Sequence, residues 1–213
     1  MRTRLSRGLA GLFLLALPGL SQQWEMNGVV GVGAYRNLTL SNAYGRATTG
    51  FTTGALFGVS LLQHRYEHVS GEIRYVFQRS DLKVASGGTT AKFRGSTHAL
   101  HYDWLIHTRP RRAWARPFVA FGSGFKSFSG TGTEQAYQPL SQFALLTRTQ
   151  EWKPLVSLGA GVRFRLAAWA SLAAEFRDYL TPFPRNVIAP VGGATLDRWL
   201  HDLTTSLALG IRF

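Results

Sequence analysis

The sequence predicts an all-β protein: a closed eight-stranded antiparallel up-and-down transmembrane β-barrel, preceded by a cleavable signal peptide. Three observations predict it. After residue 23, apolar residues alternate with polar or small residues in eight segments of about ten residues or more. The connections between these segments are alternately long and short. The first 21 residues are basic and then apolar, as in an export signal.

The N-terminal segment predicts export. Arg2, Arg4 and Arg7 precede an apolar run over residues 8–20, and small residues follow near Ser21. We therefore expect a signal peptide at residues 1–21 and one barrel domain at residues 22–213. The alternative is a buried N-terminal helix. Nothing later in the chain supplies the ~18 consecutive apolar residues of a transmembrane helix, and the chain has no cysteine, which suits a fold that needs no disulfides.

Eight strands follow from the period-two alternation. In the fourth, Leu100, Tyr102, Trp104 and Ile106 share one face and polar residues take the other. An even number of antiparallel strands can close a single-chain barrel. The predicted strands lie near residues 24–37, 48–62, 67–79, 92–107, 117–126, 154–163, 168–180 and 203–213.

The connections predict two different ends of the barrel. Short turns are expected at 63–66, 109–115 and 166–169, and long loops rich in Gly, Ser, Thr, Asn or Pro at 37–46, 80–90, 129–151 and 181–198. Short turns on one side and long loops on the other are typical of the periplasmic and extracellular ends of an outer-membrane barrel. The last two loops also carry more apolar residues than a solvated loop needs, so they either cap the barrel or bind a partner.

The polar face predicts the interior. A soluble ligand-binding barrel would turn this face to water, but here it carries many glycines, which weaken an exposed strand and instead make room inside a narrow barrel. Charged residues share that face, Glu25 and Arg165 among them. We expect a paired network in the lumen, because unpaired buried charges are expensive. Its members are Glu72, Arg74, Asp103, Lys126, Arg163, Glu175, Arg177, Asp202 and Arg212.

Aromatic residues predict two belts on the apolar face, one at each membrane interface. The belt on the turn side consists of Trp24, Trp104, Trp114, Trp169 and Phe213, and that on the loop side of Tyr75, Phe77, Phe125, Trp152 and Phe176. The alternative is that these aromatics form the core of a soluble sandwich.

The final strand resembles the sorting signal of bacterial outer-membrane barrels. Leu207, Leu209, Ile211 and Phe213 alternate with polar or small residues, and the chain stops on the aromatic. The resemblance implies that the barrel-assembly machinery binds this segment during biogenesis.

The predicted barrel as a whole resembles the small OmpA-like, Opa-like and OmpX-like eight-stranded outer-membrane proteins. The most specific stretch is the penultimate hairpin, with GAGVRFR at 159–165 and LAAEFRDY at 172–179. The resemblance implies a location in the bacterial outer membrane, reached through the periplasm, and contact with membrane lipid and lipopolysaccharide. We expect a monomer. No peptidoglycan-binding domain is expected, since the sequence stops with the barrel.

Catalytic chemistry is weakly indicated. Ser96 and His98 share a face, and Glu67 or Asp178 could lie on the outer surface, but the spacing matches no lipid-modifying barrel. His101 and Asp103 are explained by a polar lumen. There is no metal-ligand spacing and no nucleotide-binding fingerprint, so we expect no catalytic residue, metal or cofactor.

The charge does not indicate nucleic acid. The formal net charge is +13, but no block of five or more Lys or Arg occurs. We expect a non-enzymatic outer-membrane barrel, structural or adhesin-like, that binds an unknown extracellular ligand through its loops. The alternatives are a lipid-modifying enzyme, either acyl hydrolase or transferase, and a narrow pore, although eight strands leave an interior that side chains fill.

Overall fold

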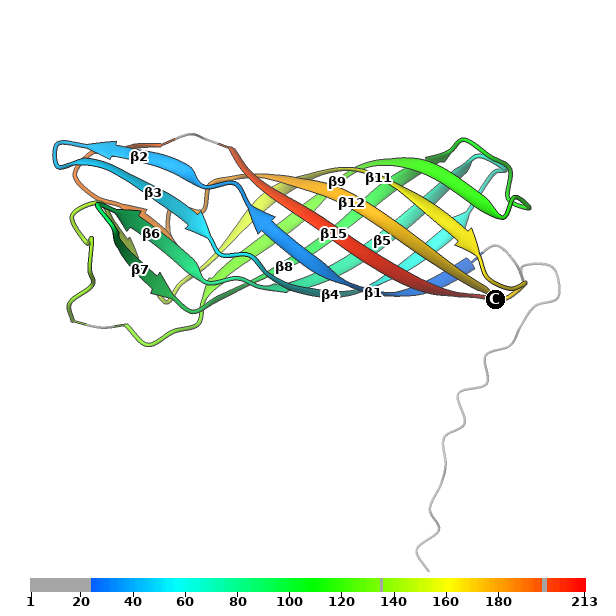
Figure 1. Ribbon diagram of the computed structural model, residues 1–213, viewed down its shortest axis with the longest axis horizontal. Helices are drawn as coiled ribbons and strands as arrows, with labels where there is room; N and C mark the ends of the chain where they lie inside the picture. The colour runs from blue at the N-terminus through cyan, green and yellow to red at the C-terminus, as the bar shows by residue number, and fades with distance from the viewer. Residues whose placement is uncertain (1–23, 135, 197–198) are drawn as a thin grey trace, which may run out of the picture.

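Eight long strands close into an antiparallel barrel (Figure 1). The computed structural model describes residues 24–134, 136–196 and 199–213, so the predicted signal peptide at 1–21 lies outside the described residues. Around the barrel the strand order is β1-β15-β12-β11-β9-β8-β5-β4, and β1 pairs with β4 to close it. The barrel strands are β1 (Trp24–Tyr35), β4 (Gly54–His64), β5 (Val69–Arg79), β8 (Gly95–His107), β9 (Ala115–Gly130), β11 (Gln150–Arg165), β12 (Ala170–Pro182) and β15 (Trp199–Arg212).

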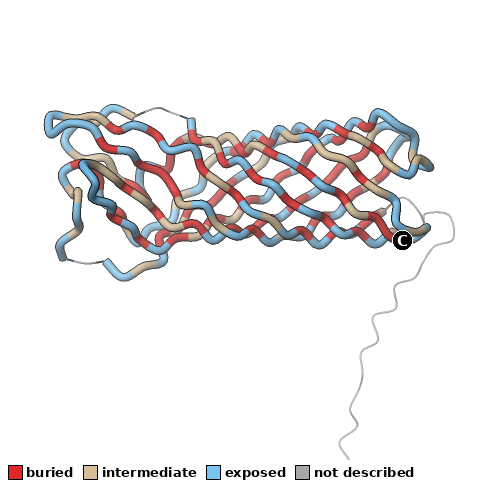
Figure 2. The backbone as a smooth tube through the Cα atoms, viewed as in Figure 1, coloured by how far each residue is buried: buried red, intermediate tan, exposed pale blue. Residues whose placement is uncertain are grey.

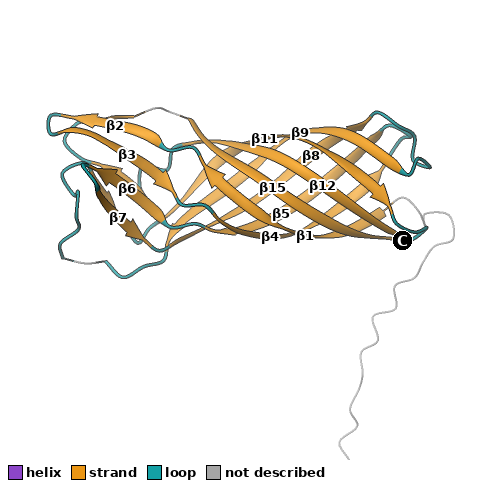
Figure 3. Cartoon of the chain, in the orientation of Figure 1, coloured by secondary structure: helices purple, strands orange, loops and turns teal. Residues whose placement is uncertain are grey.

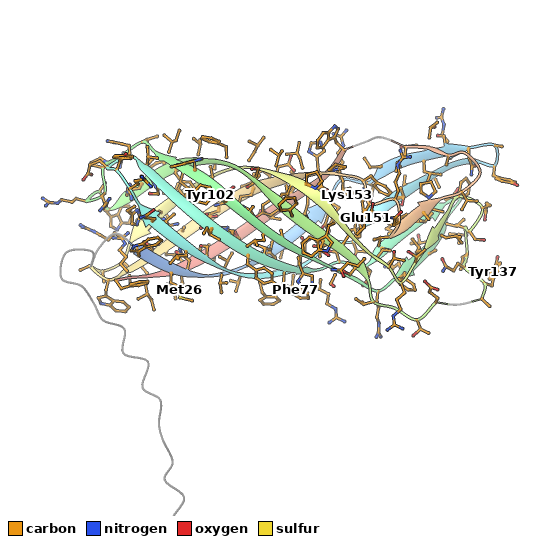
Figure 4. All side chains as sticks on the ribbon, turned by 180° about the vertical axis from the view of Figure 1, so that it is seen from behind. Met26, Phe77, Tyr102, Tyr137, Glu151 and Lys153 are labelled. Carbon is orange, nitrogen blue, oxygen red and sulfur yellow. The ribbon has the colours of Figure 1, made fainter. Side chains whose placement is uncertain are left out.

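Alternation along the strands separates an apolar outer wall from a filled lumen. Burial changes at nearly every residue along the barrel strands, as Figure 2 shows. Met26 is 56% exposed on the outside, whereas its neighbours Glu25 and Asn27 are buried. Side chains around Met26, Phe77 and Tyr102 project outward from the wall (Figure 4). A closed wall satisfies the backbone groups internally, and an apolar exterior suits the hydrocarbon of a bilayer.

The two ends of the barrel differ as the sequence predicts. Three short turns join β4 to β5, β8 to β9 and β11 to β12 at what we call the turn end, where Trp24 and Phe213 also meet. Exposed aromatic residues of the outer wall lie toward both ends: Trp104, Phe213 and the turn residues Trp114 and Trp169 near this end, and Phe125 and Trp152 toward the other. No helix among the described residues is long and apolar enough to cross a membrane.

The opposite end, the loop end, carries a folded β-structure in place of irregular loops, and this differs from our prediction. The first two predicted loops, together with the last, supply an open sheet of order β14-β2-β3-β6-β7, of which Figure 3 labels β2, β3, β6 and β7. The third and last loops form a small two-stranded sheet of β10 and β13. We call this structure the extension. Its strands are β2 (Leu38–Asn42), β3 (Gly45–Phe51), β6 (Leu82–Ser86), β7 (Thr89–Phe93), β10 (Ala144–Leu146), β13 (Ile188–Pro190) and β14 (Thr195–Leu196).

The extension has its own hydrophobic core. Leu40, Leu82, Phe128, Val187 and Ile188 are fully buried in it. Phe51 falls within the predicted second strand but is also buried here, because β3 ends at Phe51 and Thr52 and Thr53 separate it from β4. Phe143, Leu146 and Phe183 of the two apolar loops pack into the same cluster. These buried residues of the two loops therefore cap the barrel, whereas Tyr137 and Leu145 are exposed.

Candidate functional site

The lumen holds a cluster of five charged residues at its centre. Glu72 and Arg74 on β5, Asp103 on β8, and Glu175 and Arg177 on β12 point inward because alternate residues of a strand share a face. Arg74 Nη2 lies 2.9 Å from Glu72 Oε1 and 2.7 Å from Glu175 Oε2. Arg177 donates to Glu72 at 2.7 Å and to Glu175 at 3.0 Å, and also pairs with Asp103. Each arginine therefore bridges both glutamates.

A second cluster lies nearer the turn end, around Glu25. This carboxylate pairs with Arg163, accepts a hydrogen bond from Ser171 Oγ at 2.7 Å, and lies 2.9 Å from Arg212 Nε. His64 Nε2 lies 3.4 Å from the same carboxylate. Glu25, which is itself fully buried, thus offsets two arginine charges.

A third cluster marks the boundary with the extension. Lys126 is buried, pairs with Asp202, and lies 4.9 Å from the ring centroid of Tyr35 and 5.4 Å from that of Tyr179. Phe128, two residues further along β9, already belongs to the core of the extension. Side chains therefore fill the lumen from the turn end up to this boundary.

Glycines leave the room that these side chains occupy. A Cβ on Gly159 would lie 2.7 Å from Cγ of Arg177, and one on Gly210 would lie 2.5 Å from Asn27 Oδ1 and Glu25 Oε1. Both contacts are closer than real Cβ atoms allow, so the strand must approach the charged side chain here without a side chain of its own.

The structure divides the nine predicted lumen residues among these clusters. Glu72, Arg74, Asp103, Glu175 and Arg177 lie together at the centre, Arg163 and Arg212 join Glu25, and Lys126 pairs with Asp202. The prediction that Arg165 lies inside the lumen is wrong. Arg165 is on the inward side of β11 but is the last residue of the strand, where its side chain is exposed. Apolar residues such as Val29, Leu56 and Val76 also point inward, so the lumen is not wholly polar.

Sequence reasoning missed a hydrogen-bonded chain in the turn half of the lumen. His64 Nδ1 lies 3.1 Å from Ser70 Oγ, which lies 3.2 Å from His107 Nε2. His64 was missed because the predicted second strand stopped two residues before it, at residue 62. A buried arginine, Arg116, was missed in the same way, because the predicted fifth strand began one residue after it. Extending the alternation by two residues at these strand ends would have placed His64 and Arg116 in the lumen.

The residues considered for catalysis are not brought together. His98 lies on the outer wall, where its Nδ1 is 2.8 Å from the hydroxyl of Tyr75. Asp178 on β12 instead lies beside His201 on β15, with Oδ2 and Nδ1 2.7 Å apart. Two strands, β9 and β11, separate β12 from β8, which carries Ser96 and His98. Glu67 lies at the turn end, where it accepts a hydrogen bond from the backbone N–H of Arg111 at 3.0 Å; this bond lowers the pKa of its carboxyl.

His101 and Asp103 do meet, with Nδ1 and Oδ2 3.0 Å apart, but inside the central cluster. Within residues 24–134, 136–196 and 199–213, no group of three or more His, Cys, Asp or Glu is placed to hold a metal ion.

Solved structures share this architecture. Neisserial surface protein A superposes with a TM-score of 0.54 at 10% identity, over 89% of this chain and 97% of that one. The outer membrane protein OprG from Pseudomonas aeruginosa superposes with a TM-score of 0.53 at 9% identity, over 91% and 96%. This chain has the fold of the small outer-membrane β-barrels. No protein-family model matches the chain, and no curated protein matches its sequence.

The outer-membrane barrel fold confirms the predicted architecture, and the predicted location in the bacterial outer membrane agrees with it. With sequence identities near 10%, the likeness to these structures concerns the fold alone. The apolar wall is the surface that contacts membrane lipid. The predicted assembly signal, Leu207, Leu209, Ile211 and Phe213, lies exposed along the outer face of β15 and just beyond it, and its recognition by the assembly machinery stays a prediction.

Proposed function

We propose that this protein is a non-enzymatic, non-conducting outer-membrane barrel whose extension serves as a binding module at the cell surface. The observation that carries the proposal is the buried core of the extension, which turns four connections into one folded body above a filled lumen. A rigid scaffold that presents a folded surface favours recognition, because little conformational entropy is lost on binding.

The charge of the extension indicates the chemistry of its partner. Residues 36–53, 80–94, 131–149 and 183–196 contain seven basic and two acidic residues. Just below the extension, Glu151 and Lys153 of β11 pair with each other at 2.5 Å (Figure 4) and add no net charge. Arg46, Lys92 and Arg94 are exposed. This excess favours an anionic partner, such as a sulfated or phosphorylated polysaccharide.

Intact cells test the proposal, because only the extension then faces the medium. Cells that display the protein should adhere several-fold better to a surface coated with dextran sulfate than to one coated with neutral dextran. The variant Arg46→Gln/Lys92→Gln/Arg94→Gln should lose most of this preference. The control Arg112→Gln/Arg165→Gln, at the turn end, should keep it. Equal adhesion to both dextrans, or an unchanged preference in the triple variant, would contradict the proposal.

A lipid analysis tests the non-enzymatic part. Lipid A and phospholipid acyl chains should be the same in membranes with and without the protein. A reproducible difference in acyl-chain number would identify a lipid-modifying enzyme instead.

A further inference from the structure

A cavity of about 330 Å³ opens at the turn end of the barrel, on the side opposite the extension. Four regions line it: the end of β4 with its turn into β5, the turn between β8 and β9, the end of β11 with its turn, and the end of β15. Its volume lies at the lower end of the roughly 300–1,000 Å³ of small-molecule sites. The lining residues are His64, Glu67, Arg111, Arg112, Arg165, Ala168 and Arg212.

Four guanidinium groups therefore converge on one small cavity. Of these, Arg212 pairs with Glu25, but Arg111, Arg112 and Arg165 lie within salt-bridge distance of no carboxylate among the described residues. The one acidic residue of the lining is Glu67, whose carboxylate already accepts the backbone N–H of Arg111. Like charges held this close repel one another unless an anion lies between them.

Buried donors point to the same conclusion. Nε of Arg111 is buried and has no hydrogen-bond partner in the part of the chain that the structure describes. The same holds for Nη1 of Arg116, a residue that is only 1% exposed and lies within range of the charges of Arg111 and Arg212. A buried N–H of an arginine without an acceptor costs free energy, which an incoming oxyanion would recover.

The surroundings of the cavity place it at the level of lipid headgroups. Trp114 and Trp169 are 69% and 63% exposed in the turns that flank it, and Leu166 and Phe213 are exposed nearby. Exposed Trp residues of a membrane barrel lie at the interface between the acyl chains and the headgroups. Phosphate groups of the adjacent leaflet are therefore within reach of the arginines.

We propose that this cavity binds a phosphate group through Arg111, Arg112 and Arg165. Planar guanidinium groups match phosphate oxygens in pairs, and several of them select a phosphate over a monovalent halide. The phosphate can come from two sources, the headgroup of an anionic phospholipid or free inorganic phosphate, and both offer the same oxyanion. This site is independent of the extension and of the partner proposed for it.

Two arms of one experiment test the site on the full barrel in a nonionic detergent with 150 mM NaCl. In the first arm, calorimetry follows titration with inorganic phosphate, with sodium chloride of equal ionic strength as the blank. In the second, native mass spectrometry counts the phosphatidylglycerol retained by the barrel, with phosphatidylcholine as the blank. Retention of phosphatidylglycerol alone would identify the lipid headgroup as the ligand, and binding in both arms would add free phosphate.

The variant Arg112→Gln/Arg165→Gln should weaken binding about tenfold or more, as expected when charge-assisted hydrogen bonds are lost. Both side chains are exposed, so the barrel should still fold and shift on heating in gel electrophoresis. The control Arg65→Gln/Arg109→Gln removes two exposed charges from the same end of the barrel that do not line the cavity, and it should bind as the wild type does. No binding above the blanks in either arm, or equal weakening in both variants, would overturn the proposal.

Discussion

At the scale of single residues, ion pairs between buried side chains should stabilise the lumen. Glu175 lies between Arg74 and Arg177, and all three are buried. Glu175→Ala should lower the free energy of unfolding by about 3 kcal/mol, because two buried guanidinium charges lose a common partner. Urea unfolding in lipid bilayers measures the change.

The matched control is Ser157→Ala. Ser157 is fully buried in the lumen, but its Oγ has no hydrogen-bond partner among the described residues, so the substitution should change stability little. Ser171 would be a poor control since it donates to Glu25. If Glu175→Ala and Ser157→Ala had equal effects, Glu175 would not lie among the arginines.

Gly210 tests the packing of the cluster around Glu25. Gly210→Ala should cost about 1–3 kcal/mol, because the new Cβ would press on Glu25 and Asn27. Gly28→Ala, on the outer face of β1, is the control, since a Cβ there meets nothing within 4 Å. The two variants can be compared by thermal unfolding in the same detergent, and equal midpoints would rule out the close approach at Gly210.

At the scale of elements, the extension should unfold separately from the barrel. Phe128 is buried between Phe51 and Lys126, with ring centroids of the two phenylalanines 5.2 Å apart. Phe128→Ala should cost the extension about 3–5 kcal/mol through the cavity it leaves. Limited proteolysis should then cut the extension while the barrel keeps its heat-modifiable mobility. Tyr137→Ala, 77% exposed at the tip labelled in Figure 4, should leave the cleavage pattern of the wild type unchanged.

The elements also show what the sequence could predict. Barrel strands are long and have one apolar face, so their positions and inward faces follow from a period of two. The strands of the extension are two to seven residues long and rich in Gly, Ser and Thr, and their pairing joins segments far apart in the chain, such as β14 with β2. Nothing local distinguishes them from loops. For the same reason, the division of the lumen into three clusters required the register between strands, which alternation alone does not give.

At the scale of the whole molecule, the barrel should not conduct. The three charge clusters fill the lumen, and above them the rings of Tyr35, Phe51 and Phe128 pack against one another in an apolar layer. An ion would have to separate buried pairs and then cross that layer, which is costly in a medium of low polarity. Planar-bilayer recordings of the wild type should show no steady conductance. A large, steady current would identify the chain as a pore and contradict the closed lumen.

Assembly of the whole barrel provides the final prediction. The backbone N–H of Phe213 donates to the carbonyl of Trp24 at 3.1 Å, next to the seam between β1 and β15, and its ring is half-exposed at the turn end. Losing one such hydrogen bond costs only about 1 kcal/mol, too little to unfold a barrel. If Phe213 acts as an assembly signal, its removal should therefore impair assembly in cells far more than folding in detergent.

Phe213→Ala separates the two effects, because it keeps the backbone hydrogen bond and the chain length but removes the ring. We expect both the deletion of Phe213 and Phe213→Ala to leave unfolded protein in the periplasm, while the purified variants refold in detergent with almost the stability of the wild type. Heat-modifiable mobility on gels reports both measurements. Normal assembly of Phe213→Ala in cells would show that the aromatic ring is not recognised, whereas equal losses in cells and in detergent would assign Phe213 a purely structural role.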